Sequence, residues 1–175
     1  WSLALVYEAL FSAYETSLTG SAVLSSPRQP QLKDHVLWLQ KQDCAAAQTF
    51  WQASLDGFTE ATPIADMALG DGPIADRRVA PVFSAHDTRA LVQFARSIGV
   101  TMSTVVQFGW ACVLASFSRS MDVVFGLTVS GRSESNLKGV NDIVGILINT
   151  MPVRVTFDGT GATSVAEALL ALQAQ

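Results

Sequence analysis

The stretch that decides the fold is residues 123–155, VVFGLTVSGRSESNLKGVNDIVGILINTMPVRV. A continuous apolar run rich in Val and Phe covers 122–130 and is typical of a buried strand. A Gly-, Ser- and Asn-rich segment follows, and residues 150–157 then alternate between apolar and other side chains. We therefore predict two interior strands joined by a polar loop, which is costly to order unless it packs against another layer.

Helical periodicity on both sides of this stretch predicts a layered α/β domain. We expect helix 1–18 to be buried on most sides, and helix 103–117, which has almost no polar face, to be central. Residues 59–78 read as a long surface connection, and Pro81 makes 77–83 a weak edge strand. The predicted order is α-α-α-β-α-α-β-loop-β-α, with further helices over 84–98 and 165–175.

Capping side chains support the helix boundaries. The expected caps are Ser2, Asp34, Asp43, the Ser84/Asp87 pair and the Ser164/Glu167 pair. Gly57 is expected to close the third helical segment. Whether the segments at Asp34 and Asp43 form one kinked helix or two is open.

Composition predicts a globular chain with apolar surface left over. Of the 175 residues, 49% are hydrophobic and 15% are charged, which suggests surfaces that meet another part of a protein. A net charge of −4 without a basic block gives little support to nucleic-acid binding. No apolar run reaches the roughly 18 residues of a membrane span. We expect no nucleic-acid or membrane partner and, because the chain opens on Trp1, a fragment of a longer polypeptide.

The thiols and imidazoles lack the spacing of a catalytic or metal site. Cys44 and Cys112 lie inside helical patterns, so we expect two buried free thiols and an intracellular, reducing compartment. His35 and His86 each lie near a helix start and are expected at the surface. No metal site, nucleophile elbow or nucleotide-binding motif is predicted.

Three polar residues of the loop and its return are candidates for a functional role. Arg132 follows a strand and a glycine, and we expect it to bond loop carbonyls, with a bound carboxylate as the alternative. Asn149 either pins the loop or reaches a substrate, with equal weight. Asp142 is a possible base, but we expect a solvated or capping carboxylate. These residues form no complete catalytic constellation.

Two segments of the stretch, VVFGLTVSGR at 123–132 and VGILINTMPVR at 144–154, resemble the core motifs of condensation domains of nonribosomal peptide synthetases. The WLQ of 38–40 followed by FWQASLDG at 50–57 resembles the family's tryptophan helix and FW-x3-L-x-G segment. The opening WSL resembles the residues that follow the family's H-H-x-x-x-D-G active-site motif. The resemblance spans the chain and corresponds to the middle of the full domain.

The resemblance implies a chloramphenicol-acetyltransferase-like fold, two α/β subdomains in a V with a tunnel between them. It implies amide-bond formation between an acyl or peptidyl thioester and an aminoacyl thioester, both carried on phosphopantetheine of carrier domains. Residues 1–76 would end the N-terminal subdomain and its connecting helices, and 77–175 would be part of the C-terminal subdomain with a floor loop at 130–149. The implied partners are the upstream and downstream carrier domains, an adenylation domain and the missing N-terminal subdomain, in the cytoplasm.

The resemblance assigns supporting roles to the site residues. The positions expected to line the tunnel or brace it are Trp38, Ser130, Gly131, Arg132, Gly145 and Asn149. The motif histidine is expected upstream of Trp1, so no residue is assigned to catalysis and the isolated chain is expected to be inactive. No cofactor is expected on the domain itself. A coenzyme-A-dependent acyltransferase of the same fold and a non-catalytic carrier-docking piece remain alternatives.

Overall fold

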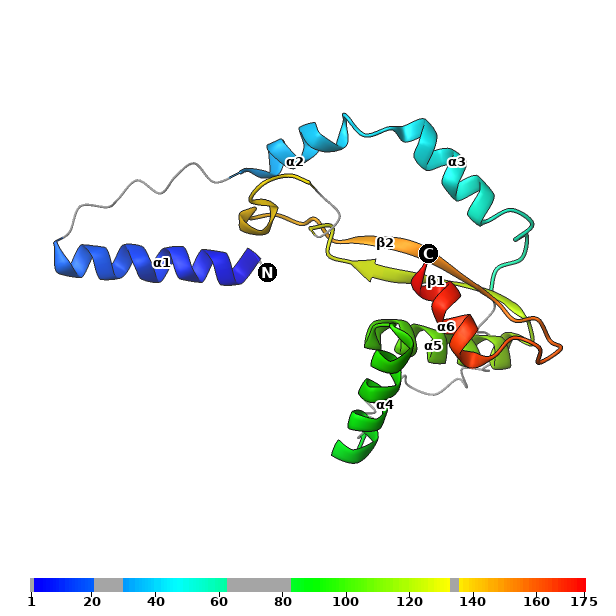
Figure 1. Ribbon diagram of the computed structural model, residues 1–175. Helices are drawn as coiled ribbons and strands as arrows, with labels where there is room; N and C mark the ends of the chain where they lie inside the picture. The colour runs from blue at the N-terminus through cyan, green and yellow to red at the C-terminus, as the bar shows by residue number, and fades with distance from the viewer. Residues whose placement is uncertain (1, 21–29, 63–82, 133–135) are drawn as a thin grey trace, which may run out of the picture. The chain divides into compact units, whose positions relative to one another are not determined.

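The computed structural model describes residues 2–20, 30–62, 83–132 and 136–175 (Figure 1). In chain order the elements are α1 (Ser2–Thr19), α2 (Leu32–Leu39), α3 (Cys44–Ser54), α4 (Ala85–Ile98), α5 (Met102–Ser118), β1 (Asp122–Val129), the 3-10 helix η1 (Val140–Asp142), β2 (Asn149–Thr156) and α6 (Val165–Gln173). Most of the predicted connection and edge strand between α3 and α4 lies outside the described residues.

The chain divides into two compact units. The first unit contains Trp1–Ala53 and Leu127–Met151, and the second contains Ser54–Gly126 and Pro152–Gln175. The predicted loop at 130–149 therefore lies wholly within the first unit.

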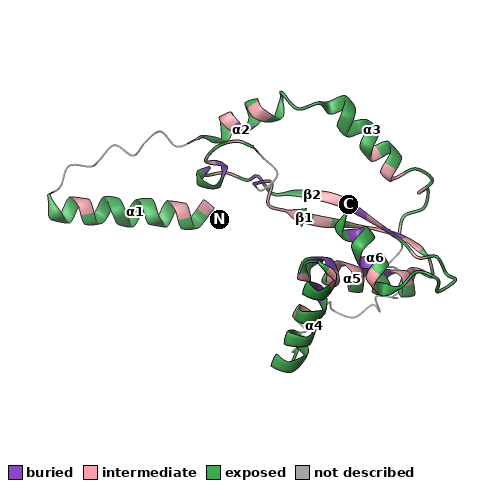
Figure 2. Cartoon of the chain, in the orientation of Figure 1, coloured by how far each residue is buried: buried purple, intermediate pink, exposed green. Residues whose placement is uncertain are grey.

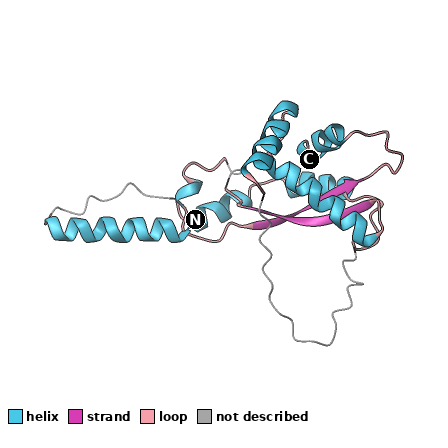
Figure 3. Cartoon of the chain, turned by 90° about the horizontal axis from the view of Figure 1, so that it is seen from below, coloured by secondary structure: helices cyan, strands magenta, loops and turns pink. Residues whose placement is uncertain are grey.

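The two predicted strands form a two-stranded antiparallel sheet (Figure 3). Just beyond the strand ends, the backbone N–H of Phe157 donates to the carbonyl of Met121 at 2.7 Å. This bond sets the register, so Val123 lies opposite Val155, and both side chains are buried. Among the described residues each strand has one strand neighbour, so the interior position that their apolar runs predicted is not observed.

Helix α1 forms where predicted, but the expectation that it is buried was wrong. None of its residues is buried, and large side chains such as Leu10 and Phe11 are about 60% exposed (58% and 61%; Figure 2). Apolar residues all round a helix predict burial only if other segments cover it. The described part of the chain does not cover α1.

Helices α2 and α3 are separate helices with different N-terminal caps. Gln31 is the N-cap of α2, and its N–H donates to the Asp34 carboxylate at 2.7 Å. Asp34 therefore acts at the third helical position and not as the cap itself. Asp43 caps α3 as predicted, because its Oδ1 accepts from the backbone N–H groups of Ala45 and Ala46 at 3.0 and 2.9 Å.

The second unit has its core where α4, α5 and α6 meet. Ala95, Val100 and Leu169 are buried there, with Phe108 packed against them. The predicted caps of α4 and α6 are confirmed, since Ser84 and Ser164 both accept from the backbone of the third helical residue. Helix α5 is only partly central, because a stripe of its side chains is exposed. That stripe comprises Val106, Trp110, Val113 and Phe117.

Two predictions about single residues were wrong. Cys44 and Cys112 are free, as expected, but both are exposed. Cys44 opens α3 and Cys112 lies within α5, and because both are exposed neither faces a core. His35 is buried, whereas His86 is exposed as predicted.

Within the described residues no single helix is long and apolar enough to cross a membrane. Helices α4 and α5 together have the length and apolar composition of a span, but the pair is bent by 103°.

Candidate functional site

The side chain of Arg132 organises the loop between the two strands. It is 6% exposed, and its Nη1 donates to the carbonyls of Val140 and Ile143 at 2.7 and 3.1 Å. Its Nη2 donates to the carbonyl of Gly145 at 3.2 Å. A guanidinium has five donors in a fixed plane, so it can hold several carbonyls at once. The predicted role of Arg132, bonding loop carbonyls, is confirmed.

The two residues before Arg132 shape the turn that buries it. Ser130 Oγ accepts from the backbone N–H of Arg132 at 3.2 Å. Gly131 has φ +66°, and a Cβ there would collide with the carbonyl oxygen of Leu147. Only glycine allows both this backbone conformation and this close approach.

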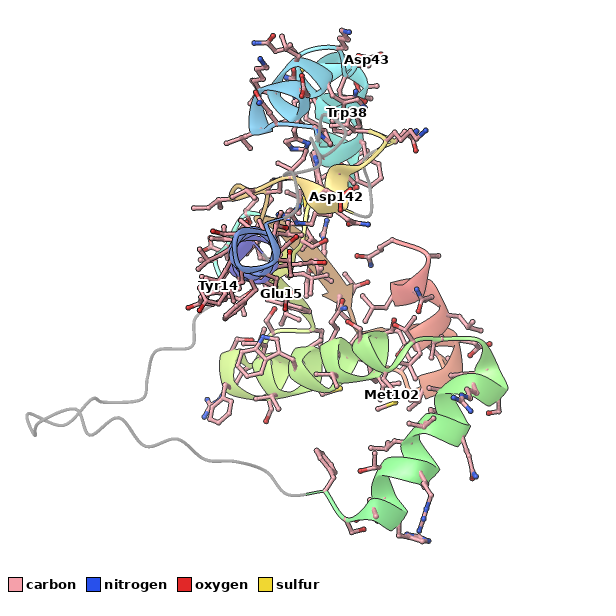
Figure 4. All side chains as sticks on the ribbon, turned by 90° about the vertical axis from the view of Figure 1, so that its left-hand side faces the viewer. Tyr14, Glu15, Trp38, Asp43, Met102 and Asp142 are labelled. Atoms are coloured by element: carbon pink, nitrogen blue, oxygen red, sulfur yellow. The ribbon has the colours of Figure 1, made fainter. Side chains whose placement is uncertain are left out.

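A small core lies under the loop. Val140, Ile143 and Leu147 are buried together, with Leu137 packed against them. These apolar positions offset the cost of ordering the Gly- and Asn-rich residues 136–149. Asp142, on η1, is exposed (Figure 4), in agreement with a solvated carboxylate and not with a base in a closed site.

The loop is also tied to the first residue of α1. Ser2 Oγ accepts from the N–H of Gly145 at 3.1 Å and donates to its carbonyl at 3.0 Å. The expectation that Ser2 serves as an N-cap missed this long-range contact. Gly145 also lies against α2, since a Cβ there would stand 3.0 Å from Leu32 Cδ1. A side chain at position 145 would require the Leu32 side chain to shift.

One face of α2 and the end of this loop form a half-open pocket of about 590 Å³, which we call the α2 pocket. All of its lining belongs to the first unit. The lining residues are Leu32, His35, Val36, Trp38, Leu39, Val129, Gly131, Ile146, Leu147, Ile148, Asn149 and Met151. The structure thus brings together Trp38, Gly131 and Asn149, three of the residues singled out in the sequence.

His35 is the lining residue that sequence reasoning missed. It is 8% exposed, its ring stacks on Trp38 with 5.7 Å between ring centroids, and its Nδ1 has no hydrogen-bond partner among the described residues. Its surface placement was predicted because it lies near a helix start. The signal that could have found it is its spacing: it shares a helix face with Leu32, Val36 and Leu39.

Asn149 lies at the start of β2 and is exposed. Its Oδ1 accepts from the N–H of Thr150 at 2.8 Å, which orients the amide and leaves its NH₂ group as a donor. The structure therefore gives Asn149 a local backbone contact together with a place in the pocket lining.

The second unit has a separate polar cluster around Arg154. Its Nε and Nη2 donate to the two carboxylate oxygens of Asp122 at 3.0 and 2.8 Å, and this contact raises the pKa of Arg154. Its Nη1 donates to the carbonyls of Ser54 and Asp56 at 3.2 and 2.7 Å, and the guanidinium lies 5.7 Å from the centre of the Phe58 ring. These contacts fasten the segment after α3 to the sheet.

The described residues offer a place to bind, and the histidine–carboxylate contact between His86 and Asp87 lies outside it. His86 is exposed, and its Nδ1 lies 3.5 Å from Oδ1 of the neighbouring Asp87. No group of three His, Cys, Asp or Glu side chains in the described part of the chain is arranged to hold a metal ion. The α2 pocket is lined by apolar groups together with His35 and Asn149, and its lining holds no carboxylate, ammonium or guanidinium, so it suits a mainly apolar ligand.

The family model for the condensation domain matches residues 1–175. A linear gramicidin synthase protein of Brevibacillus parabrevis is 40% identical over 159 residues, 89% of this chain and 3% of that protein. Chondramide synthase cmdD of Chondromyces crocatus is 37% identical over 160 residues, 90% of this chain and 4% of that protein. The chain thus spans a few per cent of the length of these relatives.

Solved structures show the same fold. The X-domain from teicoplanin biosynthesis has a TM-score of 0.72 at 24% identity, covering 99% of this chain and 40% of that chain. The first condensation domain of the CDA synthetase has a TM-score of 0.65 at 21% identity, with 98% and 38% covered. The predicted α/β fold of the chloramphenicol-acetyltransferase type is confirmed. The subdomain boundaries and the tunnel roles of the site residues stay predictions.

Proposed function

Because the chain belongs to the condensation-domain family, we propose that it is part of a domain that forms peptide bonds in nonribosomal peptide synthesis. The observation that carries this proposal is the family match over the whole of residues 1–175. The ordered SGR turn, with Arg132 holding three loop carbonyls, supports it, because the motifs that match are the ones that shape the loop and the pocket.

In the proposed reaction, the nitrogen of a carrier-bound aminoacyl group attacks the carbonyl carbon of a second thioester. The new C–N bond forms, the C–S bond breaks, the amine loses a proton and the released thiolate takes one up. Such a step needs oriented reactants, a proton acceptor and donors for the oxyanion. We assign this chain to orientation, since its described residues supply a preformed pocket.

We propose that the proton acceptor comes from a part of the protein beyond these residues. The two histidines of the sequence are 51 positions apart along the chain, at 35 and 86, so they do not form the paired-histidine motif. His35 is buried against Trp38, and His86 is exposed on α4. The partners we propose are two carrier domains whose phosphopantetheine arms deliver the thioesters, an adjacent adenylation domain and a further α/β subdomain.

The test is a domain graft. Residues of this chain replace the matched segment of a condensation domain in the linear gramicidin synthase protein, and product formation between two loaded carrier domains is followed by mass spectrometry. We expect the graft to form the amide and the isolated chain to form none. A graft that folds, keeps its carriers loaded and yet makes no amide would contradict the proposal, as would turnover by the isolated chain.

The control graft carries Arg132→Met, which removes the donors that hold the loop. We expect it to fold and to lose most of the amide formation, because the walls of the pocket are no longer fixed. Saturable binding of acetyl-coenzyme A by the unmodified graft would instead favour a diffusible acyl donor.

A further inference from the structure

The α2 pocket has one wall made by a single helix face. Leu32, His35, Val36 and Leu39 follow one another at helical spacing and all line the cavity. The opposite wall is the segment 146–149 with Met151. Both walls belong to the first unit.

The chemistry of the lining selects against charge. None of the twelve lining side chains is a carboxylate, an ammonium or a guanidinium. An ionised group entering this pocket would lose hydration and would meet no carboxylate, ammonium or guanidinium, whereas an apolar group would lose unfavourable contact with water. The lining therefore favours an apolar, uncharged occupant.

The wall opposite α2 is held before any ligand arrives. Arg132 bonds three carbonyls of the loop, and Ser2 Oγ bonds both backbone groups of Gly145, directly before Ile146. The absent side chain of Gly131 lets Leu147 approach the turn. A pocket fixed in this way loses little freedom on binding, which favours affinity.

Two polar groups give the occupant a direction. His35 is more than nine-tenths buried, and its Nδ1 has no partner among the described residues. A buried polar atom without a partner is uncommon and calls for an explanation, such as a group that arrives with a ligand. Asn149 adds an amide donor to the same lining. The occupant thus carries a neutral hydrogen-bonding group, such as a carbonyl or an amide, beside its apolar part.

We propose that the α2 pocket binds the apolar, uncharged side chain or acyl tail of a thioester-bound substrate, with His35 and Asn149 next to its neutral polar group. The inference rests on the proposed function, which supplies thioesters as the ligand class. It goes further in naming a pocket, a polarity requirement and the residues that impose it.

The experiment uses the fluorescence of Trp38 to report binding in the α2 pocket. In the full chain, Trp1, Trp51 and Trp110 are changed to Phe, which leaves the indole in the pocket as the only one. Its fluorescence is titrated with the N-acetylcysteamine thioesters of octanoic acid and of N-acetyl-leucine, which represent an acyl tail and an aminoacyl side chain. The matched probe is an octanoyl analogue whose chain ends in a carboxylate. We expect saturable binding of at least one uncharged probe and at least tenfold weaker binding of the carboxylate probe.

A pair of variants separates the pocket from general surface effects. Ile146 lines the pocket and is 86% exposed, so Ile146→Glu places a charge in the lining without disturbing a core. Val144 is 52% exposed and is absent from the lining, so Val144→Glu adds the same charge nearby. We expect Ile146→Glu to weaken binding at least tenfold and Val144→Glu to leave it within twofold.

Several results would overturn the proposal. These are no saturable change with either uncharged probe, equal binding of the carboxylate probe, or equal effects of the two Glu variants. Self-association of the chain that Ile146→Glu abolishes would assign the pocket to a second copy instead. If the graft forms the amide but the chain binds no probe, the result contradicts only the pocket inference. If the chain binds a probe but the graft forms no amide, the result contradicts only the proposed function.

Discussion

At the scale of single residues, Arg132 holds the loop together, because one buried guanidinium satisfies three backbone carbonyls. Changing Arg132 to Met should leave those carbonyls without donors and lower the free energy of opening of the loop by about 3 kcal/mol, since hydrogen bonds to charged groups are the strong ones. Amide hydrogen exchange of a peptide covering 139–149 measures this. Arg96→Met, in the exposed last turn of α4, is the control and should leave that peptide unchanged. If this peptide exchanges its amide hydrogens at the same rate in Arg132→Met as in the unmodified chain, the apolar core alone orders the loop.

Gly131 makes a second prediction at this scale. Gly131→Ala should destabilise the chain more than Gly99→Ala, and urea unfolding of both variants tests this. Both glycines have positive φ, +66° and +76°, so each alanine carries the cost of about 1–2 kcal/mol for a left-handed backbone. Only at Gly131 would the new Cβ also collide with the carbonyl of Leu147, whereas the space beside Gly99 is open. If Gly131→Ala and Gly99→Ala lower the unfolding free energy equally, the backbone at Leu147 moves aside at little cost.

At the scale of elements, the turn between β2 and α6 depends on one carboxylate. Hydrogen bonds from the side chain and backbone of Thr163, with others from Gly161 and Thr160, lower the pKa of Asp158 to about 2. A lowered pKa means that the unfolded chain binds the proton more readily, so this stabilisation is present above about pH 4 and is lost as the pH falls towards 2. Asp158→Asn should therefore lower Tm at pH 7, and the difference should be much smaller at pH 2. A Tm difference that is the same at both pH values would contradict this account.

The start of α5 depends on the end of α6. Gln173 Oε1 accepts from the backbone N–H of Thr101 at 2.9 Å and from the hydroxyl of Thr104 at 2.7 Å. Gln173→Ala should cost about 1 kcal/mol of unfolding free energy, because the backbone N–H of Thr101 and the hydroxyl of the buried Thr104 both lose this acceptor. Thermal unfolding followed by circular dichroism measures it, with Gln93→Ala on the exposed face of α4 as the matched control. If Gln173→Ala loses no more unfolding free energy than Gln93→Ala, water takes over the hydrogen bonds that Gln173 accepts.

The elements also show what a sequence can and cannot predict. Caps and turns depend on neighbours within four residues, so Asp43, Ser84 and Ser164 were correctly assigned from spacing alone. Burial depends on which distant segment covers a face, and that is why α1 was wrongly expected to be buried and His35 to be exposed. The bond from Ser2 to Gly145 joins residues 143 positions apart, and no local pattern indicates it. The motifs predicted the loop and the role of Arg132, but not the pocket that α2 completes.

At the scale of the whole molecule, the described residues leave much apolar surface uncovered. Leu3, Leu10, Phe11 and Leu18 of α1 are each more than half exposed, and α5 carries its exposed stripe. Exposed patches of this kind mark surfaces for another partner or for association. The relatives in which matching segments occur are far longer than this chain, and a larger domain would offer such cover.

We expect the isolated chain to associate through these surfaces as its concentration rises, in a range that sedimentation velocity resolves. Leu10→Glu with Phe11→Glu on α1 should reduce the association, because two exposed apolar side chains are replaced by charges. Added charge alone also opposes association, so the control carries Ser12→Glu and Ala13→Glu, which add the same two charges two residues further along the helix. The apolar surface of α1 is the cause if the first pair lowers the associated fraction and the control pair does not. Equal effects would assign the association to net charge, and a chain that stays monomeric throughout would show that its exposed apolar side chains find cover within the chain itself.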